Sequence, residues 1–282
     1  MRACLKPGWF ISILTAFLLV SSLTAQEFEL PDAPEPQQIV PFLAPLLLEA
    51  APRVEEALAD PQRGFVRNVP IVPRTTQWAE VTKQSAYFLT AQHLFRLLQP
   101  KTRSQLGGPF FADYVSSVEG IHGWGDGDGP ITNYLLHPGE GAVSSFIYLQ
   151  NSPHRKLEFD PSSGEYWSSR LKGMAFAAVY STQFEIGPYS EASIGNVGMK
   201  PGTSGYVDFI MTPVGGFALT VAEDAVDRQW IRPMEENPNR GANRIRITRS
   251  LLNPNRSIAN LLRGKAPWYR DSRPMPKHRG IE

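Results

Sequence analysis

Apolar residues recur with a helical period through much of the chain, and Pro and Gly interrupt this pattern often. The segment 75–99 shows the pattern most clearly, because threonines that can cap a helix precede it and Pro100 follows it. The side predicted to be buried carries Trp78, Val81, Phe88, Leu89 and Phe95, widened by Leu94 and Leu98.

The same reasoning predicts further helices separated by loops rich in Gly and Pro. They cover 109–118, 139–150, 165–186, 206–230 and a short segment near 257–263. Alternation in 175–186 also allows a strand, and Pro213 with Gly215 and Gly216 predicts a break inside 206–230. The predicted fold class is mainly α, an irregular bundle of short to medium helices.

Composition along the chain predicts four parts. Residues 1–25 read as a secretory signal peptide, with Arg2 and Lys6 before an apolar stretch and small residues after it. That stretch is shorter than the ~20 residues of a spanning helix, although an uncleaved anchor is the alternative. The other parts are a Pro-rich lead with a short apolar helix (26–74), a helical core domain (75–230) and a basic Pro/Arg-rich tail (231–282).

Two features of composition limit the classes of function that the chain could have. The one cysteine, Cys4, lies in the predicted signal peptide, so the mature chain would have no disulfide, thiolate nucleophile or Cys-ligated zinc. The net charge of +1 hides an asymmetry: 228–282 has 13 Lys and Arg against 4 Asp and Glu (+9), and the remainder has 15 against 23 (−8). Such a tail is either solvated, folded onto the acidic body, or bound to an anionic lipid surface. It has no stacking motif between its arginines, which argues against nucleic acid.

Residues that could carry chemistry gather around the segment 133–145, where an apolar run ends in His137 and a small-residue helix follows. The signatures of zincins, P-loop enzymes, dinucleotide enzymes and ordinary lipases are missing. The candidate catalytic set consists of His137, Glu185, Asp208 and Glu223, ionisable residues on mostly apolar segments, with Thr212 beside them. A buried acid needs a partner or a shifted pKa. These groups could form a general base with its orienting acid, hold a divalent metal, or fix helix register as a hydrogen-bonded network.

The loop 123–130 offers a second candidate site. Asp126 and Asp128 alternate with glycines, as at the start of an EF-hand, which predicts a divalent metal such as calcium. Pro130 follows and no Glu occupies the twelfth position, so the alternatives are a looser oxygen site with Glu119 and Asn133, or an exposed turn without metal.

Three motifs occur in order: HPGEGA (137–142), STQFEIGPYSE (181–191) and DFIMTPVGG (208–216). Together they resemble a domain of unknown function found in predicted envelope proteins of Gram-negative bacteria. The resemblance covers about 133–223 and implies an envelope location and a helical architecture. It singles out His137, Glu185, Asp208, Thr212 and Pro213, and implies no particular reaction.

The sequence therefore predicts an exported bacterial envelope protein, in the periplasm or associated with the outer membrane. The favoured interpretation is a non-enzymatic protein that binds an anionic lipid surface or an outer-membrane protein. The alternative is a lipid- or glycan-modifying enzyme with His137 as base and Glu185 or Asp208 as orienting acid or metal ligand.

Overall fold

A computed structural model describes residues 74–104, 106–194, 205–237, 239–273 and 275. The predicted signal peptide (1–25), nearly all of the lead (26–74) with its short apolar helix, and the end of the tail lie outside these residues. All regular structure in the described ranges is helical and no strand occurs in them, which confirms the mainly α fold class.

The helices vary in length, and loops with Gly or Pro join most of them. In chain order they are α3 (Trp78–Leu98), α4 (Pro100–Arg103), α5 (Phe110–Glu119), η2 (Thr132–Leu136), α6 (His137–Gln150), α7 (Gly164–Ile186), α8 (Glu191–Ile194), α9 (Val207–Ile210), η3 (Met211–Gly215), α10 (Gly216–Val226), η4 (Asp227–Ile231), α11 (Arg232–Glu236), α12 (Ala242–Leu252) and α13 (Pro254–Leu262). The segments named η are π-turns, in which one turn holds an extra residue.

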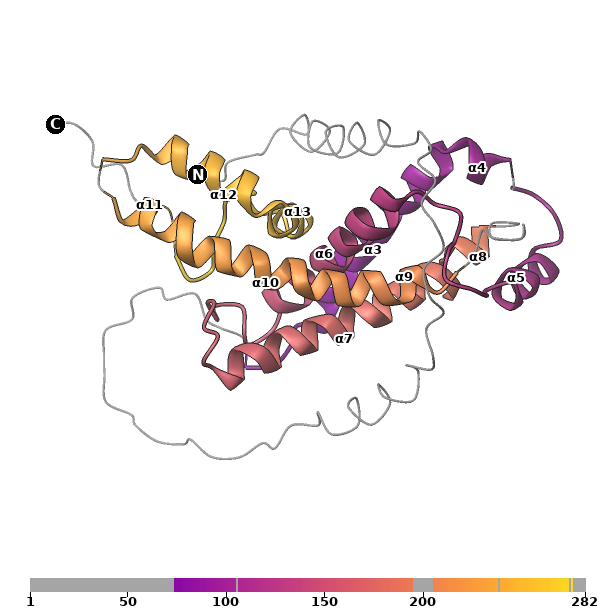
Figure 1. Cartoon of the computed structure of the whole chain (residues 1–282), viewed down its shortest axis with the longest axis horizontal. Helices are drawn as coiled ribbons and strands as arrows, with labels where there is room; N and C mark the ends of the chain where they lie inside the picture. The colour runs from indigo at the N-terminus through magenta and orange to yellow at the C-terminus, as the bar shows by residue number, and fades with distance from the viewer. Residues whose placement is uncertain (1–73, 105, 195–204, 238, 274, 276–282) are drawn as a thin grey trace.

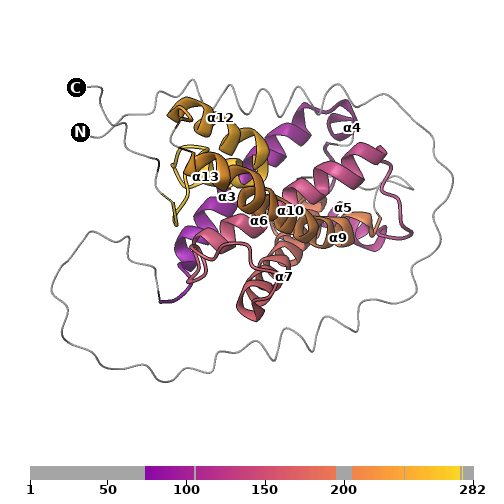
Figure 2. The same ribbon diagram turned by 60° about the vertical axis from the view of Figure 1, so that its left-hand side comes forward.

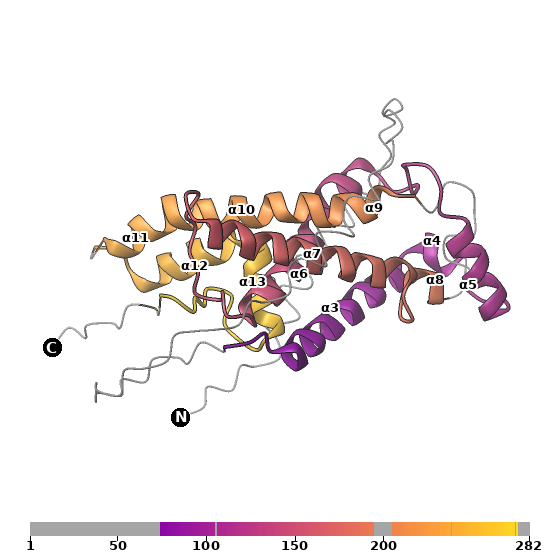
Figure 3. The same cartoon turned by 90° about the horizontal axis from the view of Figure 1, so that it is seen from below.

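Helix α6 is the centre of the bundle. Its apolar side chains Val143, Phe146, Ile147 and Leu149 are buried, and α3, α7, α10 and α13 all pack against it (Figure 2). Helices α7 and α10 run side by side across the molecule, as Figures 1 and 3 both show. Helices α12 and α13 lie at one end of the bundle, and α4, α5 and α8 lie at the other.

Two glycines let α6 and the η3–α10 segment approach each other closely. A Cβ atom on Gly141 would lie 1.7 Å from the carbonyl oxygen of Thr212, and one on Gly216 would lie 2.5 Å from the carbonyl carbon of Gly141. Backbone atoms therefore occupy the space that any side chain would need. This contact fixes the start of α6 beside α9 and η3.

The break predicted inside 206–230 is absent. The five elements α9, η3, α10, η4 and α11 form one continuous helix, Val207–Glu236, and Pro213 lies in the π-turn η3. Proline has no amide hydrogen to donate, and the π-turn is a place where the regular α-helical hydrogen bonds are already interrupted. By length and composition alone this helix could cross a membrane, a property it shares with core helices of soluble proteins. Its buried side carries Thr212, Gly216 and Thr220.

The buried side of α3 also differs from the prediction. Trp78, Leu94 and Leu98 are mostly exposed, while the polar residues Gln84 and Gln92 face inward with Val81 and Phe88. The side chain of Gln84 exchanges hydrogen bonds with Asn151, and Gln92 Oε1 accepts one from Tyr180, which compensates their desolvation, although Gln92 Nε2 is buried without a hydrogen bond. Apolar periodicity could not reveal these distant partners.

The predicted tail belongs to the same packed unit as the core. The predicted boundary at Trp230 falls inside the long helix, and α13 buries Ala259 and Leu262 against α6. The short helix predicted near 257–263 is confirmed within α13, whereas α12 was not predicted. Described arginines of the tail pair with acids of the body, as Arg256 does with Asp224. Acids of the body thus balance part of the positive charge of the tail.

Candidate functional site

His137 begins α6 at the junction with the π-turn η2, where Pro138 starts the helix. Its side chain is buried, and each ring nitrogen lies near a carboxylate. Nδ1 is 3.2 Å from Glu140 Oε2, and Nε2 is 3.1 Å from Asp208 Oδ1. The predicted approach of His137 and Asp208, which are 71 positions apart in the sequence, is therefore observed.

The loop with the two predicted metal ligands is held against the start of α9. The backbone amides of Tyr206 and Val207 donate to the carbonyls of Gly123 and Trp124, at 3.0 Å each. The carboxylate of Asp126 points inward and accepts hydrogen bonds from Asn133 Nδ2 (2.9 Å) and the Asp128 amide (3.0 Å). These bonds fix the orientation of Asp126.

Asp126, His137 and Asp208 form one buried group, which we call the His137 centre. One ligand atom from each residue lies within 4.8 Å of the other two. Although His137 Nε2 and Asp208 Oδ1 are 3.1 Å apart, neither atom has a hydrogen bond. Two ligands of one metal ion, each at about 2.0–2.2 Å from it, have a separation of about 3 Å and point at the ion, not at each other. The observed arrangement fits that pattern.

Glu185 of α7 lies in the same electrostatic environment. Its Oε1 atom is buried without a hydrogen bond. Burial raises its pKa well above the ordinary value, and the charges of Glu191 and Asp208 raise it further. The structure thus brings a third member of the predicted set close enough to interact with the His137 centre.

The protonation of the centre follows from burial and from its acids. Burial alone would lower the pKa of His137, but the charges of Glu140 and Asp208 outweigh it and raise the pKa to about 9. Burial raises the pKa of Asp208 well above its usual range, although His137 opposes that shift. In the absence of a cation, His137 therefore carries the positive charge among these buried acids at neutral pH.

The two loop aspartates do not face one site. Asp128 pairs with Arg96 at 3.1 Å, and Arg96 also pairs with Glu191 at the start of α8. The convergent ligand set joins Asp126 to His137 and Asp208 instead. Asp128 therefore faces Arg96, whereas Asp126 converges with His137 and Asp208; metal binding by the loop stays a prediction.

Glu223 does not join this network. Its carboxylate accepts bonds from the backbone amides of Asn255 (2.8 Å) and Arg256 (3.1 Å), in the first turn of α13. Burial raises its pKa to about 7, against the opposing effect of these two amides. It stabilises a helix start, as negative groups do there. Glu223 lies 15 residues after Asp208, a rise of roughly 22 Å along the helix, so it does not join His137.

The sequence interpretation missed three residues of this region: Arg96, Glu140 and Glu191. Glu140 lies one turn after His137, so the spacing of i and i+3 was an available signal. Arg96 follows Gln92 by four residues on the buried side of α3, and that pattern of polar residues was also visible. Nothing in the sequence indicated that Glu191 would meet Arg96.

Comparisons with protein-family models, with curated proteins and with solved structures found no match. The resemblance of the three motifs to a family of envelope proteins therefore stays a prediction. The geometry of the site is therefore the basis for inferring the function of the protein.

Proposed function

We propose that the protein is an envelope enzyme that modifies lipid, and that its reactive centre is the His137 centre with a bound divalent cation. The observation that carries the proposal is the convergence of three buried ligand atoms from Asp126, His137 and Asp208. The location in the envelope rests on the sequence pattern of residues 1–25 and on the motif resemblance.

The surroundings of the three ligands support metal binding. Glu140 accepts from Nδ1 of His137 in the neutral ring, which leaves Nε2 as the ligand atom, and Asn133 orients Asp126. Carboxylate or amide partners behind metal ligands are the usual arrangement in proteins. A cation would also compensate Asp126 and Asp208, two acids that share one histidine. An imidazole with two carboxylates suits zinc, manganese or iron better than calcium.

The surface beside the centre favours a lipid over a glycan. Ile131, Tyr134 and Leu135 precede His137 in sequence and are exposed, and Tyr206 and Val214 are exposed on the neighbouring helix. Exposed apolar side chains clustered on adjacent elements are typical of membrane or ligand contact. The apolar group of a lipid would find matching surface next to the charged centre.

The chemistry expected of such a site is metal-assisted hydrolysis. A divalent cation held by Asp126, His137 and Asp208 would polarise the ester oxygen and lower the pKa of a water molecule. Glu185, in its ionised form, would accept the proton of that water, because a raised pKa makes the carboxylate a stronger base and its Oε1 atom has no hydrogen bond. Asp208 and His137 hold their positions through the glycine contact between α6 and η3.

The test is metal content combined with activity. Protein purified without chelator is expected to contain about one equivalent of a transition metal, measured by inductively coupled plasma mass spectrometry. The substitutions Asp126→Asn, His137→Gln and Asp208→Asn should each remove the metal and the hydrolysis of fluorogenic lipid esters. Glu185→Gln should keep the metal and lose activity, because it changes the proton acceptor alone.

Asp160→Asn is the matched control, since Asp160 is an exposed acid bonded to Ser162 far along the sequence from the centre. It should retain both metal and activity. Wild-type protein that takes up no divalent cation after dialysis against zinc, manganese or iron would contradict the proposal. So would metal that persists in all three ligand variants.

A second candidate is the non-enzymatic lipid-associated protein. One observation favours it: the long helix Val207–Glu236 has the length and apolar composition of a membrane-spanning helix. The basic tail gives it less support than its charge indicated, because the described arginines pair with acids of the body. This candidate would be favoured by two results together. Wild-type protein would hydrolyse no lipid, and metal-free Glu185→Gln protein would float with neutral liposomes.

A further inference from the structure

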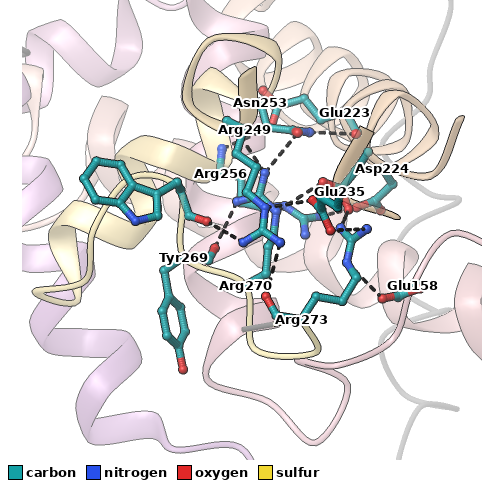
Figure 4. Close-up of polar contacts among 12 residues, drawn as sticks. Glu158, Glu223, Asp224, Glu235, Arg249, Asn253, Arg256, Tyr269, Arg270 and Arg273 are labelled. Atoms are coloured by element: carbon teal, nitrogen blue, oxygen red, sulfur yellow. Dashed lines mark hydrogen bonds and ion pairs between the residues drawn. The ribbon is translucent and has the colours of Figure 1, made fainter. Parts of the chain in front are cut away.

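A pocket lies at the other end of α6 from the His137 centre, beside Phe146, Leu149 and Gln150. These residues are nine or more positions after His137, which is a rise of roughly 14 Å along the helix. The loop that carries Glu158, the second half of the long helix and the segment 269–273 form the other walls. Figure 4 shows some of the charged side chains of the lining, Arg256, Arg270 and Arg273 with Glu158 and Asp224, and beside them Arg249 and Glu235, which lie outside it.

Positive charge exceeds negative charge in the lining. Four acids face the pocket: Glu158, Asp224, Asp227 and Asp271. The seven arginines are Arg155, Arg170, Arg228, Arg256, Arg263, Arg270 and Arg273. Seven positive charges against four negative charges leave an excess of three. We call this lining the arginine pocket.

The arginines share their acids, so the excess is not removed by pairing. Asp224 receives both Arg170 (2.7 Å) and Arg256, and Asp227 receives both Arg270 (3.2 Å) and Arg273. Arg256 Nε is buried and makes no hydrogen bond. Arg273 Nε lies 3.3 Å from Glu158 Oε1, but outside hydrogen-bond geometry. Contacts within the protein thus leave these guanidinium donors of the lining without a hydrogen bond.

The electrostatics of the buried Arg270 agree with a positive excess. Burial lowers its pKa, and the nearby charge of Arg256 lowers it further, to about 10, despite the pairing with Asp227. An additional anion in the pocket would relieve this repulsion. Guanidinium groups match the geometry of phosphate oxygens and bind them with charge-assisted hydrogen bonds.

We infer that the arginine pocket binds the oxyanion of a phosphate ester, at a site separate from the His137 centre. The ligand chemistry is a phosphate group with two or more negative charges. A lipid headgroup and a soluble phosphate ester share this chemistry. Anion binding in the arginine pocket does not depend on metal binding at the His137 centre, because the two sites have no residue in common.

The experiment measures binding of three probes by full-length protein at low and moderate salt. Pyrophosphate and inorganic phosphate are titrated by calorimetry, and vesicles of phosphatidylcholine with or without phosphatidic acid are used in flotation. We expect pyrophosphate to bind and to raise the melting temperature, with affinity falling as salt rises. Added binding to phosphatidic acid vesicles that pyrophosphate abolishes would identify a lipid headgroup as the source. Pyrophosphate binding without vesicle binding would identify a soluble ester.

Two arginines one turn apart on the long helix provide matched variants. Arg228 lines the pocket, whereas Arg232 does not, and both pair with Glu158. We expect Arg228→Gln to weaken pyrophosphate binding about tenfold, the effect of one charge-assisted hydrogen bond, and Arg232→Gln to leave it unchanged.

Either of two results would overturn the inference. One is that pyrophosphate, phosphate and phosphatidic acid vesicles all fail to bind to folded wild-type protein. The other is that Arg232→Gln weakens binding as much as Arg228→Gln, since the effect would then come from the general charge of the surface. Circular dichroism of both variants checks that they are folded.

Discussion

The two charged regions of this bundle solve the problem of buried charge in opposite ways. At the His137 centre, Asp126 and Asp208 lie near one histidine, and His137 Nε2 and Asp208 Oδ1 make no hydrogen bond, although Asp126 accepts two. In the arginine pocket, arginines outnumber acids, and each acid pairs with at least one arginine, as Asp224 does with Arg170 and Arg256. The first region places two acids beside one histidine, whereas the second joins helices through ion pairs and keeps an excess of positive charge.

The largest effect should come from the close glycine contact between α6 and η3, beside the His137 centre. Gly141→Ala would place a methyl group 1.7 Å from the backbone carbonyl of Thr212, so η3 would have to move away from α6. We expect a loss of about 3 kcal/mol or more in the free energy of unfolding, measured by urea denaturation. Gly139→Ala is the control on the same helix, because its new methyl group would lie 3.5 Å from Asn255 Oδ1, an ordinary contact. Equal stability of the two variants would contradict the packing described.

A pair of Asp→Asn substitutions tests the contrast directly. Asp224→Asn removes the charge that balances the buried Arg170 and Arg256, and should cost about 3–5 kcal/mol of unfolding free energy. Asp208→Asn in metal-free protein should change it by less than about 1 kcal/mol, because burial already favours the uncharged carboxyl there. Urea denaturation after chelation measures both. The contrast fails if Asp208→Asn is the more damaging change.

The pH dependence of stability gives a smaller effect, confined to the His137 centre. The pKa of His137 is about 9 in the folded protein and about 6.5 when unfolded, so the folded state holds the proton more tightly. Its contribution is complete below pH 6.5 and is lost as pH rises through 9. Metal-free protein should lose about 3 kcal/mol of unfolding free energy over that interval. His137→Gln should remove most of this slope, and an unchanged slope would assign it to other groups.

The helical class and the meeting of His137 with Asp208 could be predicted from the sequence, for physical reasons. Helical periodicity is a local property, and an acid or histidine among apolar residues has to find a partner. The partners themselves are not local. Arg256 reaches Asp224 across 32 positions, and Arg96 reaches Glu191 across 95, so a count of tail charges gave the asymmetry but not the pairing.

Faces of helices were harder to predict where polar residues are buried. Gln84, Gln92 and Arg96 occupy the inner side of α3, where a rule based on apolar residues expects Leu94 and Leu98. Glu223 is also buried, but its partners are the backbone amides of Asn255 and Arg256, which the sequence around Glu223 does not reveal. The catalytic role of any of these residues stays a prediction, because the sequence supplies the chemistry of the groups and not the substrate.

The wide turn η3 has a consequence for how the gene can vary. One residue corresponds to about 100° of rotation in an α-helix, and the π-turn Met211–Gly215 absorbs one extra residue. Loss of a single codon there would convert the turn to ordinary α-helix and leave the two ends of the helix in about the same relative rotation, so Asp224 would still face Arg170 and Asp208 would still lie beside His137. Loss of a codon in an α-helical turn on either side would instead rotate one end against the other by that angle, so we expect codon deletions to be tolerated better within η3 than beside it.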